Sequence, residues 1–116
     1  MTSGDANNLQ EIEAKTLKQW LDEQQVILID VREQDEYANE RIAEATLMPL
    51  SQFNPAEVKP IPGKNIVLSC KSGNRSKKAA QKLFEAGFET VIHLKGGLAS
   101  WKEAGYETEV NENASA

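Results

Sequence analysis

Short runs of aliphatic residues alternate with stretches in which apolar side chains recur at helical spacing. The aliphatic runs are too short for buried helices and predict strands buried on both faces. These runs are residues 26–29, 46–48, 66–68 and 90–94. Helices are expected from Thr16 onward and at residues 33–40, 76–86 and 98–104. Buried strands separated by helices are typical of a parallel α/β sheet with helices on both faces.

Residue types that favour helix ends mark several of these boundaries. Thr16 and Gln19 have the spacing of a capping box, which places the start of the first helix there. Asn54 followed by Pro55 predicts an N-cap and the first position of a helical turn. Gly87 is expected to end the helix of residues 76–86.

The size of the chain predicts one domain with a modest core, because it has 116 residues of which 40% are hydrophobic. The compact unit is expected at residues 9–106, between a flexible N-terminal segment, 1–8, and a flexible polar tail, 107–116. The first residues lack the apolar region of a signal peptide, and no apolar run reaches the roughly 18 residues of a membrane span. We therefore expect a soluble, cytoplasmic protein.

The chain has one cysteine, Cys70, and one histidine, His93. A single cysteine excludes an intramolecular disulfide framework and a cysteine-rich zinc site, and it favours a reducing compartment. His93 lies in the middle of a predicted strand and is interpreted as a structural residue. A Ser-His-Asp triad would have to use this one histidine.

Charge is unevenly distributed along the chain, whose formal net charge is -5. Residues 1–58 carry 4 basic and 12 acidic side chains, and residues 59–116 carry 9 basic and 6 acidic ones. Residues 70–82 hold five basic side chains and no acidic one. The cluster is either a solvated helix face or a site for a small anion. A nucleic-acid surface is disfavoured, because the domain as a whole is acidic.

The segment from Ser69 to Ser76 joins a predicted buried strand to a helix and contains the cysteine. Gly73 and Asn74 tolerate the left-handed conformations of a tight turn that aims successive amides at one point. The positive end of the helix, with Lys71 and Arg75, adds further attraction for an anion. The Cys70 thiol is therefore expected to be partly accessible and to have a pKa below the ordinary value.

Four fragments in this order resemble the rhodanese-type sulfurtransferase family, specifically its small single-domain members. The segment Cys70-Lys71-Ser72-Gly73-Asn74-Arg75-Ser76 resembles the active-site loop of that family, which often has the form Cys-x-x-Gly-x-Arg-Ser. Residues 29–33 resemble its Asp-Val-Arg-Glu segment, and residues 35–37 its short acidic helix. Gly96-Gly97-Leu98 with Trp101 and Gly105 resembles its C-terminal pattern. The resemblance covers about residues 9–106.

This resemblance implies a three-layer α/β/α domain with a five-stranded parallel sheet. It also implies an enzyme whose cysteine takes a sulfane sulfur from a donor such as thiosulfate, forming a persulfide. A thiol or cyanide then accepts the sulfur, and a protein persulfide is a possible partner. Cys70 would be the nucleophile, and the amides of residues 71–75 would hold the persulfide. No metal or organic cofactor, no nucleic acid and no membrane insertion are implied.

Several residues around this loop have more specific expected roles. Lys71 and Arg75 are the candidates for holding the anionic donor, and Arg75 is also expected to donate hydrogen bonds to the backbone of the loop. Ser72, Gly73 and Asn74 complete the substrate-binding loop, and Ser76 is expected to support it. Asp30 is interpreted mainly as structural support. Arg32 is either a substrate contact or half of a structural ion pair.

The sequence departs from the family where relatives often have Gly-His-Ile-Pro-Gly-Ala. Arg41 stands in place of that histidine, so no role is transferred to it, and it is either a charge near the pocket or a packing residue.

Two other functions remain as alternatives. One is a carrier or interaction module that receives persulfide from a protein and has low free turnover. The other is a phosphatase or arsenate reductase of the same fold. The second is disfavoured because four residues separate Cys70 from Arg75, one fewer than in the phosphatase relatives.

Overall fold

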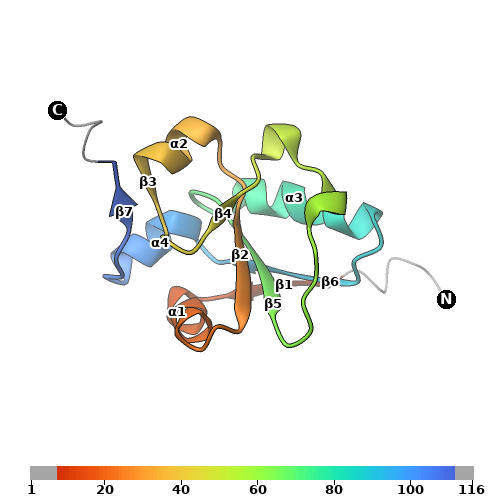
Figure 1. Cartoon of the computed structure of the whole chain (residues 1–116), viewed down its shortest axis with the longest axis horizontal. Coiled ribbons are helices and arrows are strands. Elements are labelled where there is room, and N and C mark those ends of the chain that lie inside the picture. Colours follow the sequence, from red (N-terminus) through yellow and green to blue (C-terminus); the bar gives the residue numbers. More distant parts are fainter. Residues whose placement is uncertain (1–7, 112–116) are drawn as a thin grey trace.

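The centre of the fold is a parallel sheet of five strands, seen in a computed structural model that describes residues 8–111 (Figure 1). The strands lie in the order β1-β6-β5-β2-β4. Their bounds are Asn8–Ile12 for β1, Val26–Asp30 for β2, Thr46–Leu47 for β4, Asn65–Ser69 for β5 and Thr90–Leu94 for β6. The four aliphatic runs of the sequence form β2, β4, β5 and β6. The predicted three-layer α/β/α class with five parallel strands is therefore confirmed.

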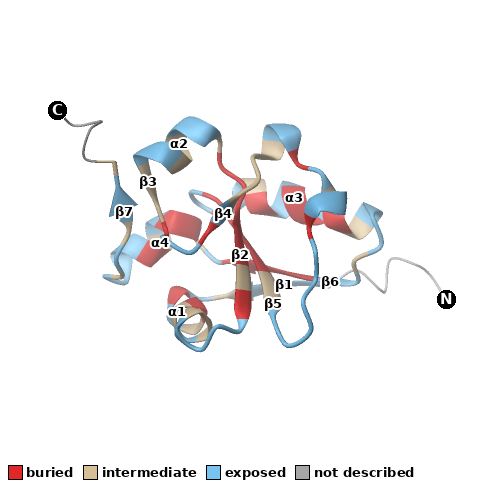
Figure 2. Cartoon of the chain, in the orientation of Figure 1, coloured by how far each residue is buried: buried red, intermediate tan, exposed pale blue. Residues whose placement is uncertain are grey.

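Helices cover both faces of this sheet because strand side chains point alternately to either side. Leu28, Val67 and Leu94 pack on the face covered by α1, Ala14–Asp22, and α4, Gly97–Glu103. The intervening strand residues pack against α3, Asn74–Glu85, and against Leu50, Phe53 and Val58, which lie in or next to two short 3-10 turns, η2 Leu50–Gln52 and η3 Pro55–Glu57. Figure 2 shows buried residues in the central strands and on parts of α1, α3 and α4.

Strand β1 is the one strand of the sheet that the hydrophobic pattern does not predict. It pairs with β6 from Asn8↔Thr90 to Ile12↔Leu94, yet its first four residues are exposed. Its stability comes from backbone pairing at the sheet edge, which leaves little apolar signal in the sequence. The folded unit therefore includes residue 8, at the end of the segment expected to be flexible.

Helix ends follow local chemistry only in part. Asn54 caps η3 as predicted, its side-chain oxygen accepting from the amide of Ala56 at 3.0 Å. The capping box predicted at Thr16 is wrong, because α1 already begins at Ala14. A capping box instead opens α2, Gln34–Asn39, where Glu36 accepts from the amide of Glu33 at 3.0 Å.

Part of the expected C-terminal tail belongs to the folded unit. Strand β7, Glu109–Val110, pairs antiparallel with β3, Glu40–Arg41. The Trp101 indole donates to the carbonyl of Glu107 at 2.9 Å, and Thr108 donates to the Glu40 carboxylate at 2.6 Å. Because polar contacts hold these residues in place, their low apolar content did not reveal that they belong to the folded unit. The remaining parts of the two expected flexible segments, 1–7 and 112–116, lie outside the described residues.

No helix within residues 8–111 has both the length and the apolar character needed to cross a bilayer.

Candidate active site

The two segments with candidate functional residues lie at one edge of the sheet, where the parallel strands have their carboxyl ends. Cys70 directly follows β5, and the Asp30–Arg32 segment ends β2, which pairs with β5 through Asp30↔Ser69. Ligands of open α/β sheets bind at this edge. The structure therefore brings together the two segments that the sequence singles out.

The loop after Cys70 wraps backbone amides around the sulfur. The amide of Gly73 donates to Cys70 Sγ at 3.0 Å, and that of Ser76 donates at 3.4 Å. Gly73 has a φ of 108°, a left-handed conformation that suits glycine and lets the chain turn directly into α3. The amides of the helix cap, Gly73, and of Ser76 in the first turn of α3 thus face the sulfur.

Helix α4 holds the same loop from the other side. The amides of Leu98 and Ala99 donate to the carbonyls of Cys70 and Lys71 at 2.8 and 3.0 Å. A Cβ on Gly97 would lie 2.3 Å from the carbonyl oxygen of Cys70, so only glycine permits this approach. The Gly96-Gly97 pair is part of the family pattern, and the structure supplies the physical reason for its second glycine.

Cys70 itself is buried, with 1% of its surface exposed, so the expectation of a partly accessible thiol is wrong. Burial raises the pKa of this thiol. Hydrogen bonds from the amide and hydroxyl of Ser76, and from the amides of Gly73 and Ser72, together lower the pKa by more than burial raises it. The net pKa lies below the ordinary value, as predicted. The main causes are hydrogen bonds of the loop rather than the charges of Lys71 and Arg75.

Arg75 points to helix α2 instead of the loop backbone. Its guanidinium donates to the two carboxylate oxygens of Glu36 at 2.6 and 2.9 Å. The hydrogen bonds from Arg75 lower the pKa of Glu36 to about 2, and those to Glu36 raise the pKa of Arg75. The sequence identifies Arg75 but not its partner, because Glu36 lies 39 residues away on an acidic helix whose carboxylates look alike.

Asp30 and Arg32 form a buried ion pair, each with about 4% exposure. The Arg32 guanidinium donates to both carboxylate oxygens of Asp30 at 2.7 to 3.0 Å, and to the carbonyl of Glu40 at 2.7 Å. The sequence left open whether Arg32 is a substrate contact or half of a structural ion pair. This geometry matches the ion pair. Arg41 lies apart, 5.2 Å from the centre of the Tyr37 ring, and pairs with Glu109 at 3.1 Å.

A cavity of about 490 Å³ opens between the loop, α2 and α4. Its lining carries several charges, from Arg32, Glu36, Glu40, Lys71 and Lys102. Lys71 is exposed, and Lys102 pairs with Glu40 at 2.8 Å. The cavity thus contains two of the predicted substrate-binding residues, together with Lys102, which the sequence analysis missed because its helix was interpreted as core.

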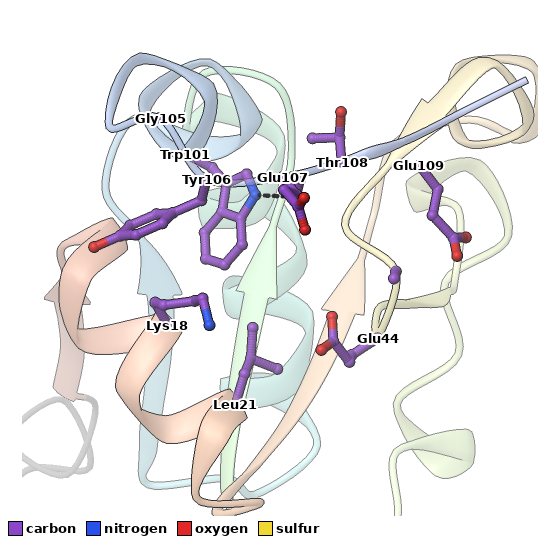
Figure 3. A pocket seen from close by; sticks show the side chains of 10 residues that line it. Lys18, Leu21, Glu44, Trp101, Gly105, Tyr106, Glu107, Thr108 and Glu109 are labelled. Atoms are coloured by element: carbon purple, nitrogen blue, oxygen red, sulfur yellow. Dashed lines mark hydrogen bonds between the residues drawn. The ribbon is translucent and has the colours of Figure 1, made fainter.

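A second hollow, of about 630 Å³, lies between α1, the segment before β4 and the C-terminal segment (Figure 3). Trp101 and Tyr106 line it with Glu44 and Glu107, and residues 70–76 do not. The Trp101 indole donates to the Glu107 carbonyl within this lining. Of these two hollows, the one of about 490 Å³ is lined by a residue of the cysteine loop, Lys71.

A single buried cysteine within a ring of amides, at the carboxyl edge of a five-stranded parallel sheet, defines a domain built to stabilise a thiolate. The family model of the rhodanese-like domain matches residues 13–104. The chain belongs to this family, as the sequence motifs indicate.

Known relatives agree with this assignment. A Synechocystis protein of uncharacterised function is 48% identical over 89% of this chain, which spans 58% of that protein. A sulfurtransferase from Allochromatium vinosum is 34% identical over 82% of this chain and 90% of its own. The crystal structure of a thiosulfate sulfurtransferase from Pseudomonas aeruginosa superposes with a TM-score of 0.78 at 26% identity, covering 90% of this chain and 21% of that one. This chain is therefore similar to sulfurtransferases in both sequence and fold.

Proposed function

We propose that this protein is a sulfurtransferase that carries a sulfane sulfur as a persulfide on Cys70. The donor is thiosulfate or a related anion, and the acceptor is a thiophile such as cyanide or a thiol. The observation that carries the proposal is the pair of amides from Gly73 and Ser76 at 3.0 and 3.4 Å from the sulfur. Such amides stabilise an anion on sulfur without requiring a metal or a charged side chain.

The two half-reactions balance with the groups at this site. The Cys70 thiolate attacks the sulfane sulfur of thiosulfate, a new S–S bond forms, and the bond to the sulfonate sulfur breaks. Sulfite leaves with the electron pair of that bond, and the persulfide remains on Cys70. The acceptor then attacks the outer sulfur, and the Cys70 thiolate is regenerated as the leaving group.

Charged side chains have secondary roles in this proposal. Lys71, exposed at the cavity beside the loop, attracts the dianionic donor and is assigned to substrate binding. Arg75 is assigned to holding α3 against α2 through Glu36, with a weaker direct effect on the donor. Asp30 and Arg32 fix the neighbouring turn, and the backbone of Ser72 and Asn74 completes the loop.

The contact between Arg75 and Glu36 also argues against the phosphatase alternative. A phosphatase of this kind needs its loop arginine to bind the phosphoryl oxygens, but here both ends of the guanidinium are bound to a carboxylate. A phosphoryl group would have to displace that pair inside a loop one residue shorter than that of the phosphatases.

Intact mass spectrometry tests the proposal directly. After incubation with thiosulfate, the protein is expected to gain the mass of one sulfur atom and to lose it on addition of cyanide. The Cys70→Ser variant is the control and should gain nothing. No gain with thiosulfate but a gain with a protein persulfide would favour the carrier function, and no gain with either donor would overturn the proposal.

A further inference from the structure

A chain of polar side chains connects the sulfur of Cys70 to the edge of the sheet. Cys70 Sγ lies 3.7 Å from the hydroxyl oxygen of Ser76, and that oxygen lies 2.8 Å from Nδ1 of His93. Nε2 of His93 lies 2.9 Å from a carboxylate oxygen of Glu11, although that oxygen is off the line of a hydrogen bond. Residues of the cysteine loop, α3, β6 and β1 thus form one continuous path.

The inner part of this path is completely buried. Ser76 and His93 have 0% exposure, whereas the Glu11 side chain is 44% exposed. His93 pairs with Leu68 on one side and with Glu11 of β1 on the other, so the sheet fixes its ring. Burying an imidazole costs free energy unless its nitrogens find partners. A hydrocarbon side chain would fill the same space without this cost, so packing alone does not account for a histidine here.

Counting hydrogens shows which protonation state suits these contacts. Ser76 has one hydroxyl hydrogen and three acceptors within reach: the Gly73 carbonyl at 3.0 Å, His93 Nδ1 and Cys70 Sγ. A carboxylate beside Nε2 favours a hydrogen on that nitrogen, so a neutral His93 must accept the hydroxyl hydrogen at Nδ1. If His93 is protonated, Nδ1 donates to Ser76 instead, and the hydroxyl hydrogen is free for a thiolate.

We propose that His93 is a positioning residue that receives the thiol proton of Cys70 through the hydroxyl of Ser76, while Glu11 stabilises the resulting imidazolium. The S–H bond of Cys70 breaks as a new O–H bond forms on Ser76, and the former hydroxyl hydrogen of Ser76 moves to Nδ1. The products are a thiolate and an imidazolium, so the net charge of the chain of residues is unchanged. The inference rests on the proposed function in so far as Cys70 is the nucleophile.

The charges around His93 are consistent with a base that is neutral before it reacts. Burial lowers the pKa of His93, Glu11 from β1 raises it, and Lys77 from α3 lowers it again, with a net lowering. The lowered pKa favours the neutral ring, which can accept a proton at Nδ1. Once the thiolate forms, its negative charge favours the imidazolium, so the two groups titrate as a coupled pair.

Replacing Glu11 with Gln distinguishes this path from a simple effect of charge. Removing a negative charge near a thiolate should by itself lower the thiol pKa, or leave it unchanged. If Glu11 acts through His93, the Glu11→Gln variant should instead raise the midpoint of Cys70 alkylation by about half a pH unit, which slows the reaction near pH 7 roughly threefold. Glu13→Gln is the matched control, because it removes an exposed carboxylate two residues away and is expected to lower the midpoint slightly or not at all.

The same coupling can be read from His93 itself, because the chain has one histidine and one cysteine. Imidazole ¹⁵N shifts should show His93 titrating at a lower pH in Cys70→Ser than in the unmodified protein, since a serine hydroxyl does not ionise. The proposal is overturned if Glu11→Gln leaves the alkylation midpoint unchanged or lowers it, or if His93 titrates alike in both proteins. Both readouts measure proton positions, so they remain informative even if no sulfur is transferred to Cys70.

Discussion

The turn after β2 and the loop after β5 end neighbouring strands, but they use charge in opposite ways. After β2, the charges of Asp30 and Arg32 neutralise each other in a buried pair. After β5, the sulfur meets backbone amides, while Lys71 is exposed and Arg75 is bound to Glu36. At this edge of the sheet, the buried charged side chains therefore stabilise the scaffold, and the backbone makes the anion site.

The largest effect is expected from Cys70→Ser, which removes the sulfur around which the loop is built. Thiosulfate:cyanide transfer should be abolished, because a hydroxyl cannot form a persulfide. The melting temperature should change little, since serine fits the same space and accepts from the same amides. Steady-state assays and thermal unfolding of both proteins check this, and activity near that of the unchanged protein would place the chemistry elsewhere.

Among changes in the turn after β2, Asp30→Asn should cause the largest loss of folding stability. It leaves the Arg32 guanidinium buried with no carboxylate, a loss of about 3–5 kcal/mol in the free energy of unfolding. The matched variant Glu36→Gln breaks the Arg75 pair, whose side chains are each 30% exposed, and should cost about 1 kcal/mol or less. Urea unfolding compares the two, and similar losses would contradict the contrast in burial.

Gly97→Ala should damage the loop through its backbone. The new Cβ would meet the carbonyl of Cys70, and the residue has a φ of +58°, so we expect a loss of about 1–3 kcal/mol and a large fall in kcat/KM. Gly105→Ala is the control, because Gly105 also has a positive φ, +88°, but no atom within 4 Å of its Cβ position. Equal activity losses in the two variants would show that the contact with the loop is unimportant.

Because of the Arg75–Glu36 pair, the free energy of unfolding should depend on pH below about 4.5. The folded-state pKa of Glu36 is about 2, below its ordinary value of 4.5. The pair therefore contributes its full stability above pH 4.5 and loses it as the pH falls towards 2. The difference in unfolding free energy between the unchanged protein and Glu36→Gln should shrink over this window, and a difference independent of pH would show that ionised Glu36 does not stabilise the fold.

Lys71→Ala should have the smallest effect of this series on stability. An exposed lysine contributes little to folding, so the melting temperature should not move. Loss of one cation near a dianionic donor should raise KM for thiosulfate with an effect of roughly 0.5–1.5 kcal/mol, and added salt should reduce it. Lys78→Ala, an exposed cation on α3, is the control, and an equal change in KM would mean that general charge, not Lys71, attracts the donor.

Local pattern predicted those parts of the fold that bury aliphatic side chains. Strands β2, β5 and β6 and helices α3 and α4 follow from runs and spacings of apolar residues. Strands β1 and β7 do not, because their polar residues are held by backbone pairing with segments far along the chain. Thr16 had the right residue type for a helix cap, but its spacing alone could not show that the helix begins two residues earlier.

The same distinction applies to the site. Cys70 and its amide loop are contiguous in the sequence, so their chemistry could be predicted from it. The burial of the thiol and the partner of Arg75 depend on the packing of separate elements. His93 was interpreted as structural because a single strand does not reveal that Ser76 and Glu11 lie against its two nitrogens.

The amide ring around the sulfur bears on how domains of this kind can diversify. Lys71, Ser72 and Asn74 contribute backbone to the loop, and all three side chains are exposed. Substitutions at these positions alter what the entrance attracts or repels while the cradle of the sulfur stays in place. Gly73 and Gly97 do not have this freedom, since one needs a left-handed backbone and the other touches the loop itself. Selection for a new donor or acceptor can therefore act on the side chains of the loop without rebuilding the group that holds the sulfur.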